Sequence, residues 1–137
     1  PQIQVFSRDN TLLSQFFAYH ENFRGGVNVA TADIDGGLRK YDEIITSPAS
    51  MGRAHIRIFD LWKGLISDFF AYDENYKART SIAIGDIDKD GLDEIITGAG
   101  AGGTSHVKVF EIDGTLLNSY MAYDENFKGG VNVAVIE

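Results

Sequence analysis

The sequence predicts an all-β fold built from repeated units of four antiparallel strands. A segment of eight residues that begins at Phe16 recurs at Phe69 and at Tyr120, at spacings of 53 and 51 residues. Short runs of β-branched and aromatic residues, separated by Gly, Asn and Asp, fill the intervals. No stretch shows sustained helical periodicity. A unit of about 50 residues with four strands is typical of a β-propeller blade.

Each unit contains four expected strands, which occur in the same order in every copy. The first and second strands are expected at 27–30 and 43–46, and again at 81–84 and 94–97. The third strand is the alternating run at 3–6, 56–59 and 107–110, and the fourth is expected at 12–19, 65–72 and 116–123. Hairpin turns at 9–10, 62–64 and 113–114 separate the third strand from the fourth.

The 137 residues form a single β-propeller repeat region of about 2.6 units. We expect the third and fourth strands of a partial blade at 1–24, full blades at 25–77 and 78–128, and the first strand of a further blade at 129–137. Because closed propellers contain about four to eight blades, this region is a partial propeller or one that an oligomer completes. Open sheet edges recruit other strands, so we expect self-association through the open blade edges.

Composition excludes several classes of function. The formal net charge is −8, which argues against nucleic acid as a partner. The chain has no cysteine, so neither a disulfide framework nor thiol chemistry is available. No apolar run approaches the roughly 20 residues of a transmembrane helix, and we therefore expect no membrane insertion. No signal peptide is visible, and the dipeptide Pro1-Gln2 stands directly before the first expected strand.

An acidic loop lies between the first two strands of the second full blade. Its sequence, DIDKDGLDE over 86–94, sets carboxylates at alternate positions, and Gly91 can adopt the positive φ of a sharp turn. Hard oxygen ligands at every second position, with glycine at the sixth, suit Ca²⁺. A bound cation would also remove the repulsion between the acids. The sequence therefore predicts a Ca²⁺ site with these ligands: Asp86, Asp88, Asp90, the Leu92 carbonyl and Glu94.

An EF-hand begins in the same way but does not fit the rest of this loop. An EF-hand requires a bidentate Glu at the twelfth loop position, and that position here is Thr97. The flanking runs at 81–84 and 94–97 are short and β-branched, which predicts strands. We therefore expect a calcium loop within a β-hairpin.

Three adjoining motifs resemble the FG-GAP (VCBS-type) repeat, the blade of integrin-α-like β-propellers. They are the acidic segment Gly85-Asp-Ile-Asp-Lys-Asp-Gly-Leu-Asp-Glu-Ile-Ile-Thr-Gly98, the Gly-rich stretch 99–106, and Val107-Lys-Val-Phe110. The resemblance extends over nearly the whole chain. It implies a Ca²⁺ ion in the loop between the first and second strands of a blade. It also implies an extracellular or cell-surface location, bacterial in most cases for repeats this regular.

The corresponding loop in the first full blade, 33–43, departs from this pattern. It is two residues longer, Gly37 replaces the third carboxylate, and Arg39 and Lys40 enter the loop. The lost acid and the added positive charge should weaken Ca²⁺ binding there, and whether this loop binds metal stays open.

Other polar features repeat with the fold, which favours structural roles. The stretch 98–104 lacks the Gly-Lys-Ser/Thr of a phosphate loop and aligns with an ordinary interstrand loop. His55 and His106 occupy equivalent positions before the third strand, which suits packing better than catalysis. The segments that follow Tyr19 and Tyr72 are interpreted as anchors for the crossing to the next blade.

These observations predict a calcium-binding propeller module with a structural or adhesion-type interaction role, and not an enzyme. Its partner, a protein or a glycan, is not specified by the sequence. One alternative is a lectin-like propeller, in which Trp62 and Tyr72 would contact the sugar. The other is a fragment of a propeller enzyme, which would require nonrepeating polar insertions.

Overall fold

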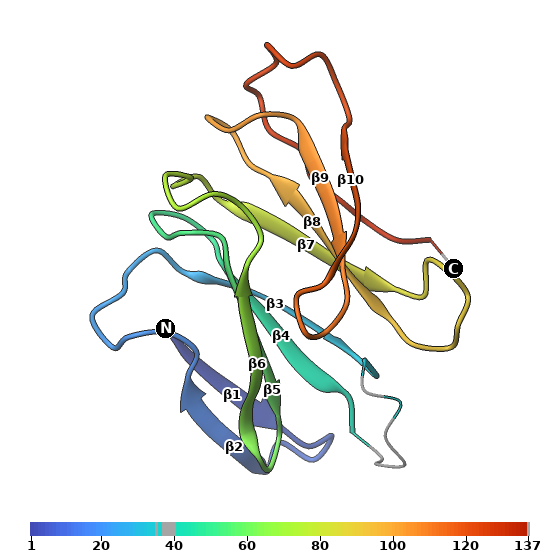
Figure 1. Cartoon of the computed structure of the whole chain (residues 1–137). Helices are drawn as coiled ribbons and strands as arrows, with labels where there is room; N and C mark the ends of the chain where they lie inside the picture. The colour runs from blue at the N-terminus through green and yellow to red at the C-terminus, as the bar shows by residue number, and fades with distance from the viewer. Residues whose placement is uncertain (35, 37–40, 137) are drawn as a thin grey trace.

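The structure is a computed structural model that describes residues 1–34, 36 and 41–136. The described part contains strands and no helix, which confirms the all-β class. Figure 1 shows a two-stranded hairpin followed by two four-stranded sheets. The hairpin consists of β1 (Gln2–Phe6) and β2 (Leu12–Phe17). The first sheet contains β3 (Val27–Ala32), β4 (Glu43–Pro48), β5 (His55–Asp60) and β6 (Gly64–Phe70). The second contains β7 (Thr80–Gly85), β8 (Glu94–Ala99), β9 (His106–Phe110) and β10 (Leu116–Met121).

Both sheets are antiparallel meanders in which each strand pairs with its neighbour in sequence. The registers match between the two sheets: Ala32 pairs with Glu43 as Gly85 pairs with Glu94. All expected strands up to residue 123 are present, and the four-stranded antiparallel sheets are consistent with propeller blades.

The fourth strands are shorter than expected, because β2, β6 and β10 end at Phe17, Phe70 and Met121. After β2 and β6 the chain turns away from its own sheet, and a tyrosine side chain reaches the next one. The sequence prediction, which extended these strands to Tyr19, Tyr72 and Tyr123, is wrong by two residues at each of these ends.

The hairpin turns lie where the sequence placed them. Asn10 and Gly114 adopt φ angles of 63° and 87°, and Gly64, which begins β6, has a φ of 79°. Asn and Gly tolerate this left-handed region with little strain, so these residues allow the tight reversals between third and fourth strands.

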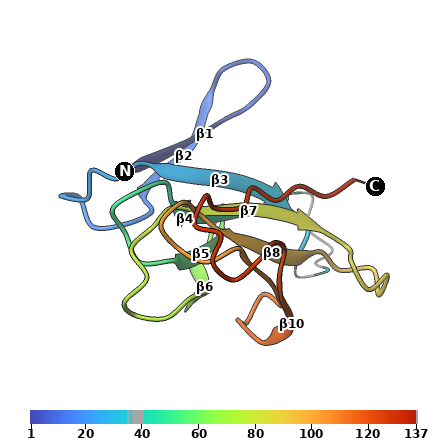
Figure 2. The ribbon, with the colours of Figure 1, turned by 90° about the horizontal axis from the view of Figure 1, so that it is seen from above.

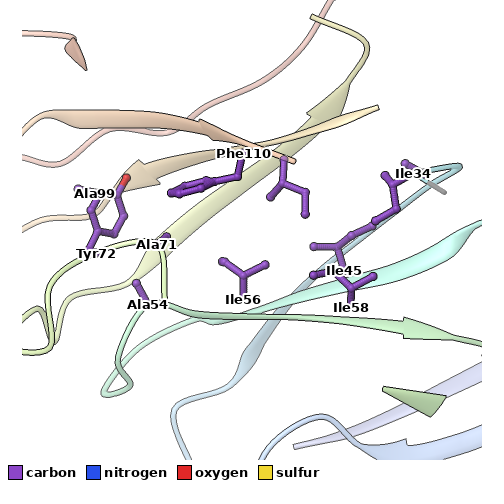
Figure 3. Close-up of a cluster of buried hydrophobic side chains, with 11 residues drawn as sticks. Ile34, Ile45, Ala54, Ile56, Ile58, Ala71, Tyr72, Ala99 and Phe110 are labelled. Carbon is purple, nitrogen blue, oxygen red and sulfur yellow. The ribbon is translucent and has the colours of Figure 1, made fainter. Parts of the chain in front are cut away.

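The main core lies between the two sheets. Ile45, Ile56 and Ile58 of the first sheet are fully buried, and they belong to one cluster with Ile95 and Phe110 of the second. Figure 3 shows Ile56 and Phe110 within this cluster. The innermost strands β3 and β7 are in contact, and Figure 2 shows them side by side. Alternation along each strand directs these apolar side chains to one face, so successive sheets pack face to face.

The segment 131–136 runs along the far face of the second sheet (Figures 1 and 2). Val131, Val133 and Val135 pack there against Ile96 and Val109. We expect this segment to be the first strand of a further blade, but residues 131–136 form no strand and pair with none of the described strands. The blade boundaries therefore remain a prediction. No described helix is long and apolar enough to cross a membrane.

Candidate metal site

The acidic loop connects β7 to β8 and is flanked by strands on both sides, which agrees with a β-hairpin and not an EF-hand. The pairing of Gly85 with Glu94 closes its base. Lys89 and Gly91 adopt φ angles of 64° and 96°. A Cβ on Gly91 would meet no atom within 4 Å, so the positive φ, and not crowding, explains the glycine.

Three aspartates of the loop accept hydrogen bonds from backbone amides within it. The Gly91 amide donates to Asp86 Oδ2 (3.1 Å) and the Asp90 amide donates to Asp88 Oδ1 (3.2 Å). The Leu92 amide donates to Asp90 Oδ1 (2.8 Å). Aspartate commonly bonds the backbone in this way in turns, and these bonds fix the path of the loop.

Glu94 differs from the aspartates because it is fully buried. Its Oε2 atom accepts hydrogen bonds from the amides of Ile87 (2.6 Å) and Asp88 (3.4 Å). Its Oε1 atom is buried and has no hydrogen-bond partner among the described residues. Burial raises the pKa of the Glu94 carboxyl, with a smaller contribution from the negative charges of Asp88 and Glu111. A buried carboxylate oxygen without a partner is costly, and Oε1 is therefore an atom that could accept a cation.

Asp86, Asp88 and Glu94 form a compact group of carboxylates. Each offers an oxygen atom, and these atoms lie within 4.8 Å of one another. Asp90 lies outside this group in the described structure, although the sequence prediction counts it as a ligand. The structure therefore brings together three of the four predicted acids.

Residues 78–110 match the family model of the FG-GAP repeat. This segment is an FG-GAP repeat. It contains β7, β8 and β9 together with the whole acidic loop, so the match falls on the strands that position the carboxylates. No curated protein and no solved structure matches the chain. FG-GAP repeats generally bind calcium and typically occur in extracellular proteins as structural or interaction modules.

Glu111 is a charged neighbour of the FG-GAP loop that the sequence analysis missed. Burial raises the pKa of its carboxyl, and the charges of Asp90, Asp88 and Asp113 raise it further. Glu111 directly follows β9, two strands away from the loop in sequence. Its only sequence signal is its position after the Val107-Lys-Val-Phe110 motif, where the preceding unit has Asp60.

The corresponding loop of the preceding unit is described only in part. Glu43 is buried, and its Oε2 atom accepts a hydrogen bond from the Ile34 amide (3.2 Å), as Glu94 does from Ile87. In both loops, therefore, a buried glutamate at the end of the loop accepts a hydrogen bond from a backbone amide near its start. The substitutions expected to weaken metal binding, at Gly37, Arg39 and Lys40, lie outside the described residues.

The residues singled out for sugar binding have different environments. Trp62 is 61% exposed, and its ring contacts that of Tyr41 edge to face with centroids 6.3 Å apart. Tyr72 is 8% exposed, and its one hydroxyl hydrogen faces the carbonyl oxygens of His106 (2.9 Å) and Thr97 (3.1 Å). Tyr72 is therefore not available to a glycan, and that part of the lectin hypothesis is wrong.

His55 and His106 have structural partners. His55 Nε2 contacts Asp68 Oδ2 and His106 Nε2 contacts Ser119 Oγ, each at 2.6 Å across a strand pair. The equivalent partners occur in both units, which agrees with a repeated packing role.

Proposed function

We propose that the chain is a calcium-binding β-propeller repeat module with a structural, adhesion-type interaction role and no catalytic activity. The observation that carries the proposal is Glu94: it is fully buried within a group of three carboxylates and keeps its Oε1 atom without a partner. A cation placed beside Oε1 would satisfy this atom and reduce the repulsion among the acids.

The donor set favours Ca²⁺ over other metals. Asp86, Asp88 and Glu94 offer only hard oxygen ligands, and the group contains no His or Cys that would select zinc or copper. Ca²⁺ accepts six to eight oxygen ligands in irregular geometry, which leaves room for Asp90, the Leu92 carbonyl and water. Mg²⁺ requires six ligands in nearly ideal octahedral geometry. The aspartates are held by hydrogen bonds to the loop's own amides, so they would reach that geometry less easily.

A calcium ion here would act on the fold and not on a substrate. The carboxylates belong to both ends of the loop, so the ion would hold β7 and β8 together at the edge of the sheet. Binding to the folded state alone raises stability by mass action. Extracellular modules bind Ca²⁺ with dissociation constants on the order of 10⁻⁴ to 10⁻³ M, a range that suits the extracellular setting typical of this repeat.

The non-catalytic role is supported by repetition. The polar contacts outside the loop, such as His55 with Asp68 and His106 with Ser119, recur between units. Recurrent contacts of this kind serve the fold, whereas a single active site would break the repeat. The bacterial cell-surface setting remains part of this proposal.

The proposal is tested by thermal unfolding and calorimetry with and without calcium. Ca²⁺ should raise the melting temperature of the chain, and chelation should reverse the rise. Asp88→Asn preserves shape but removes a charge, so it should abolish most of the rise. Asp124→Asn makes the same charge change at an exposed residue outside the group and should leave the rise intact. A calcium-induced rise that survives Asp88→Asn would refute this ligand set.

A lectin function is a second candidate, because Trp62 and Tyr41 present an exposed aromatic pair. Exposed aromatic rings stack on sugars. A glycan array probed in calcium would test this candidate, with Trp62→Ala as the variant. Met51→Ala, at an exposed apolar residue without an aromatic ring, is the control. Absence of glycan signal, or signal unaffected by Trp62→Ala, would reject it.

A further inference from the structure

The turn between β9 and β10 lies at the same end of its sheet as the acidic loop (Figure 1). Glu111 is the first residue of this turn and directly follows Phe110, the last residue of β9. Two hydrogen bonds hold its backbone: its amide donates to the Thr115 carbonyl (3.0 Å), and its carbonyl accepts from the Gly114 amide (3.0 Å). Glu111 therefore has a defined backbone position near the loop.

The register of β8 and β9 sets Glu111 beside Glu94. Ile95 of β8 pairs with Phe110 of β9 in an antiparallel arrangement. Because the strands are antiparallel, one further step along this register places Glu94 opposite Glu111. Residues opposite each other in neighbouring strands direct their side chains to the same face of the sheet. The Glu111 side chain therefore shares a face with the fully buried side chain of Glu94.

The charges around Glu111 are acidic. After burial, the causes that raise the pKa of its carboxyl are the negative charges of Asp90, Asp88 and Asp113. Glu111 in turn contributes to the raised pKa of Glu94. Within residues 1–34, 36 and 41–136, the Glu111 carboxylate accepts no hydrogen bond and pairs with no cation. Glu111 thus adds negative charge beside the carboxylate group, and no described partner compensates for it.

The equivalent residue of the preceding unit, Asp60, has a different role. Asp60 Oδ1 accepts hydrogen bonds from the amides two and three residues later, each at 2.7 Å, and so caps its own turn. In the β9–β10 turn, Asp113 Oδ1 accepts such a bond from the amide two residues later (2.8 Å). The turn therefore does not need Glu111 as a cap. The unit that carries the longer glutamate is also the one whose loop keeps the third aspartate, where the preceding unit has Gly37.

We propose that Glu111 is an outer carboxylate of the calcium site, acting on the ion from β9 without direct coordination. This inference rests on the proposed function, because the ion is the one that the unpartnered, buried Oε1 atom of Glu94 would accept. Glu111 lies outside the group whose oxygens lie within 4.8 Å of one another, so its contact with the ion passes through water. The ion would thereby connect β7, β8 and β9.

The expected effect of this carboxylate is on affinity and on selectivity. The affinity of calcium sites depends on the number of charges around the ion, and replacing an outer partner commonly weakens a metal site by about 10- to 100-fold. Glu111 acts through water and charge, so we expect the lower end of this scale. At equal distance, a divalent ion gains twice as much from this charge as a monovalent ion, so Glu111 also favours Ca²⁺ over Na⁺.

Calorimetric titration of the full chain with Ca²⁺ tests the proposal, with circular dichroism to confirm folding. Glu111→Gln keeps the shape of the side chain and removes its charge, and it should weaken calcium binding by about three- to tenfold. Glu125→Gln is the matched control. It makes the same chemical change at an exposed residue beyond β10 and should leave the affinity within about twofold of the parent.

Two further variants separate a role of charge from a role in packing. Glu111→Asp keeps the charge and should keep most of the affinity. Glu111→Lys reverses the charge, so the loss of affinity should be about the square of the loss in Glu111→Gln. Raising the salt concentration should reduce both losses by screening. Equal losses in Glu111→Gln and Glu111→Lys, unaffected by salt, would indicate a packing role and overturn the proposal.

Thermal unfolding in chelator provides a readout that does not involve the ion. Without calcium, Glu111→Gln removes repulsion from Asp88 and Asp90 and should raise the melting temperature. A lower melting temperature in chelator would mean that the carboxylate serves the fold, and it would overturn the proposal.

The calcium titration also separates this inference from the proposed function. Binding that is lost in Asp88→Asn and unchanged in Glu111→Gln would overturn the role of Glu111 and leave the calcium module intact. A parent chain that binds no calcium would overturn both.

Discussion

The hydroxyl group of Tyr72, just beyond β6, donates a hydrogen bond to the backbone carbonyl of His106 in the next sheet, at 2.9 Å. The same hydroxyl lies 3.2 Å from Thr97 Oγ1, which donates to it. Burial raises the pKa of Tyr72 far above its ordinary value, so the side chain remains a neutral donor across the physiological range. A single side chain thus links the two sheets through a buried polar contact.

Tyr72→Phe should therefore destabilise the chain by about 1 kcal/mol, since it removes the donor and leaves the His106 carbonyl without this partner. Urea unfolding followed by circular dichroism measures the change. Tyr123→Phe is the matched control: Tyr123 is the equivalent residue after β10, is 60% exposed, and should change monomer stability little. Equal effects of the two substitutions would show that the contact with the next sheet is not what stabilises the fold.

The strand pattern and the acidic hairpin could be predicted from the sequence because each depends on local spacing. Alternation in Val107-Lys-Val-Phe110 indicates a strand, and the position of Gly91 indicates a turn. The recurrence of the segment beginning at Tyr72 correctly indicated an anchor to the next unit. The strand and the turn are visible within windows of about ten residues, and the anchor is visible as a segment that recurs from unit to unit.

What could not be predicted depends on contacts between segments distant in sequence. The proximity of Glu111 to Asp88 and Asp90 arises because β8 and β9 pair, and no local spacing encodes it. The burial of Glu94 with one unsatisfied oxygen follows from packing of the loop base. The ends of β2 and β6 were placed two residues late because departure from the sheet is decided by the neighbouring sheet, which binds the tyrosine.

Glu94→Gln should reverse its effect on stability when calcium is added. In chelator, the buried Glu94 has a raised pKa in the folded state, so its ionised form opposes folding at neutral pH. The neutral Gln retains an oxygen acceptor for the Ile87 amide, and the variant should unfold at a higher temperature than the parent. In calcium the parent should unfold at the higher temperature, because the variant lacks a charged ligand and gains less stability from calcium binding.

Thermal unfolding of both proteins in chelator and in calcium tests this inversion. Asp90→Asn is the comparison, because Asp90 is exposed and lies outside the group of three carboxylates. It should shift the melting temperature in chelator much less than Glu94→Gln does. If Glu94→Gln were destabilising in both conditions, the role of the carboxylate would be to accept hydrogen bonds from the Ile87 and Asp88 amides. The proposed metal site would then lose its main support.

His106 should make stability fall as the pH drops below the ordinary histidine pKa of about 6.5. Burial lowers the pKa of His106, and the nearby charge of Lys108 lowers it further. The folded state therefore binds a proton less readily than the unfolded chain. The stabilising contribution is complete above the ordinary histidine pKa of about 6.5 and is lost as the pH falls through the lower folded-state value.

Urea midpoints measured from neutral pH downward should fall on acidification, and His106→Gln should flatten the slope. His20→Gln, at an exposed position, is the control and should leave the slope unchanged. A steeper pH dependence in His106→Gln would contradict the direction of this pKa shift. So would a urea midpoint that increases on acidification in the parent. The measurement belongs in chelator, so that carboxylate protonation does not also alter metal binding.

Gly98→Ala should displace the segment 131–136 from the second sheet while the rest of the fold persists. A Cβ at Gly98 would lie 2.7 Å from the Val131 carbonyl oxygen and 2.6 Å from Ser81 Oγ. The Ser81 side chain can rotate, but the backbone oxygen cannot move without shifting the segment. The Val131 amide donates to the Ala99 carbonyl (2.8 Å), and this bond should break when the segment moves.

Hydrogen exchange monitors this displacement amide by amide. The Val131 amide should exchange about tenfold faster or more in Gly98→Ala, because local opening becomes easier. The amides of the β3–β4 pair, in the other sheet, serve as the internal control and should keep their protection. Equal loss of protection in both places would mean that the substitution destabilises the whole chain. Selective loss of protection at Val131 would establish that segment 131–136 stays on the sheet because Gly98, which has no side chain, lets it approach closely.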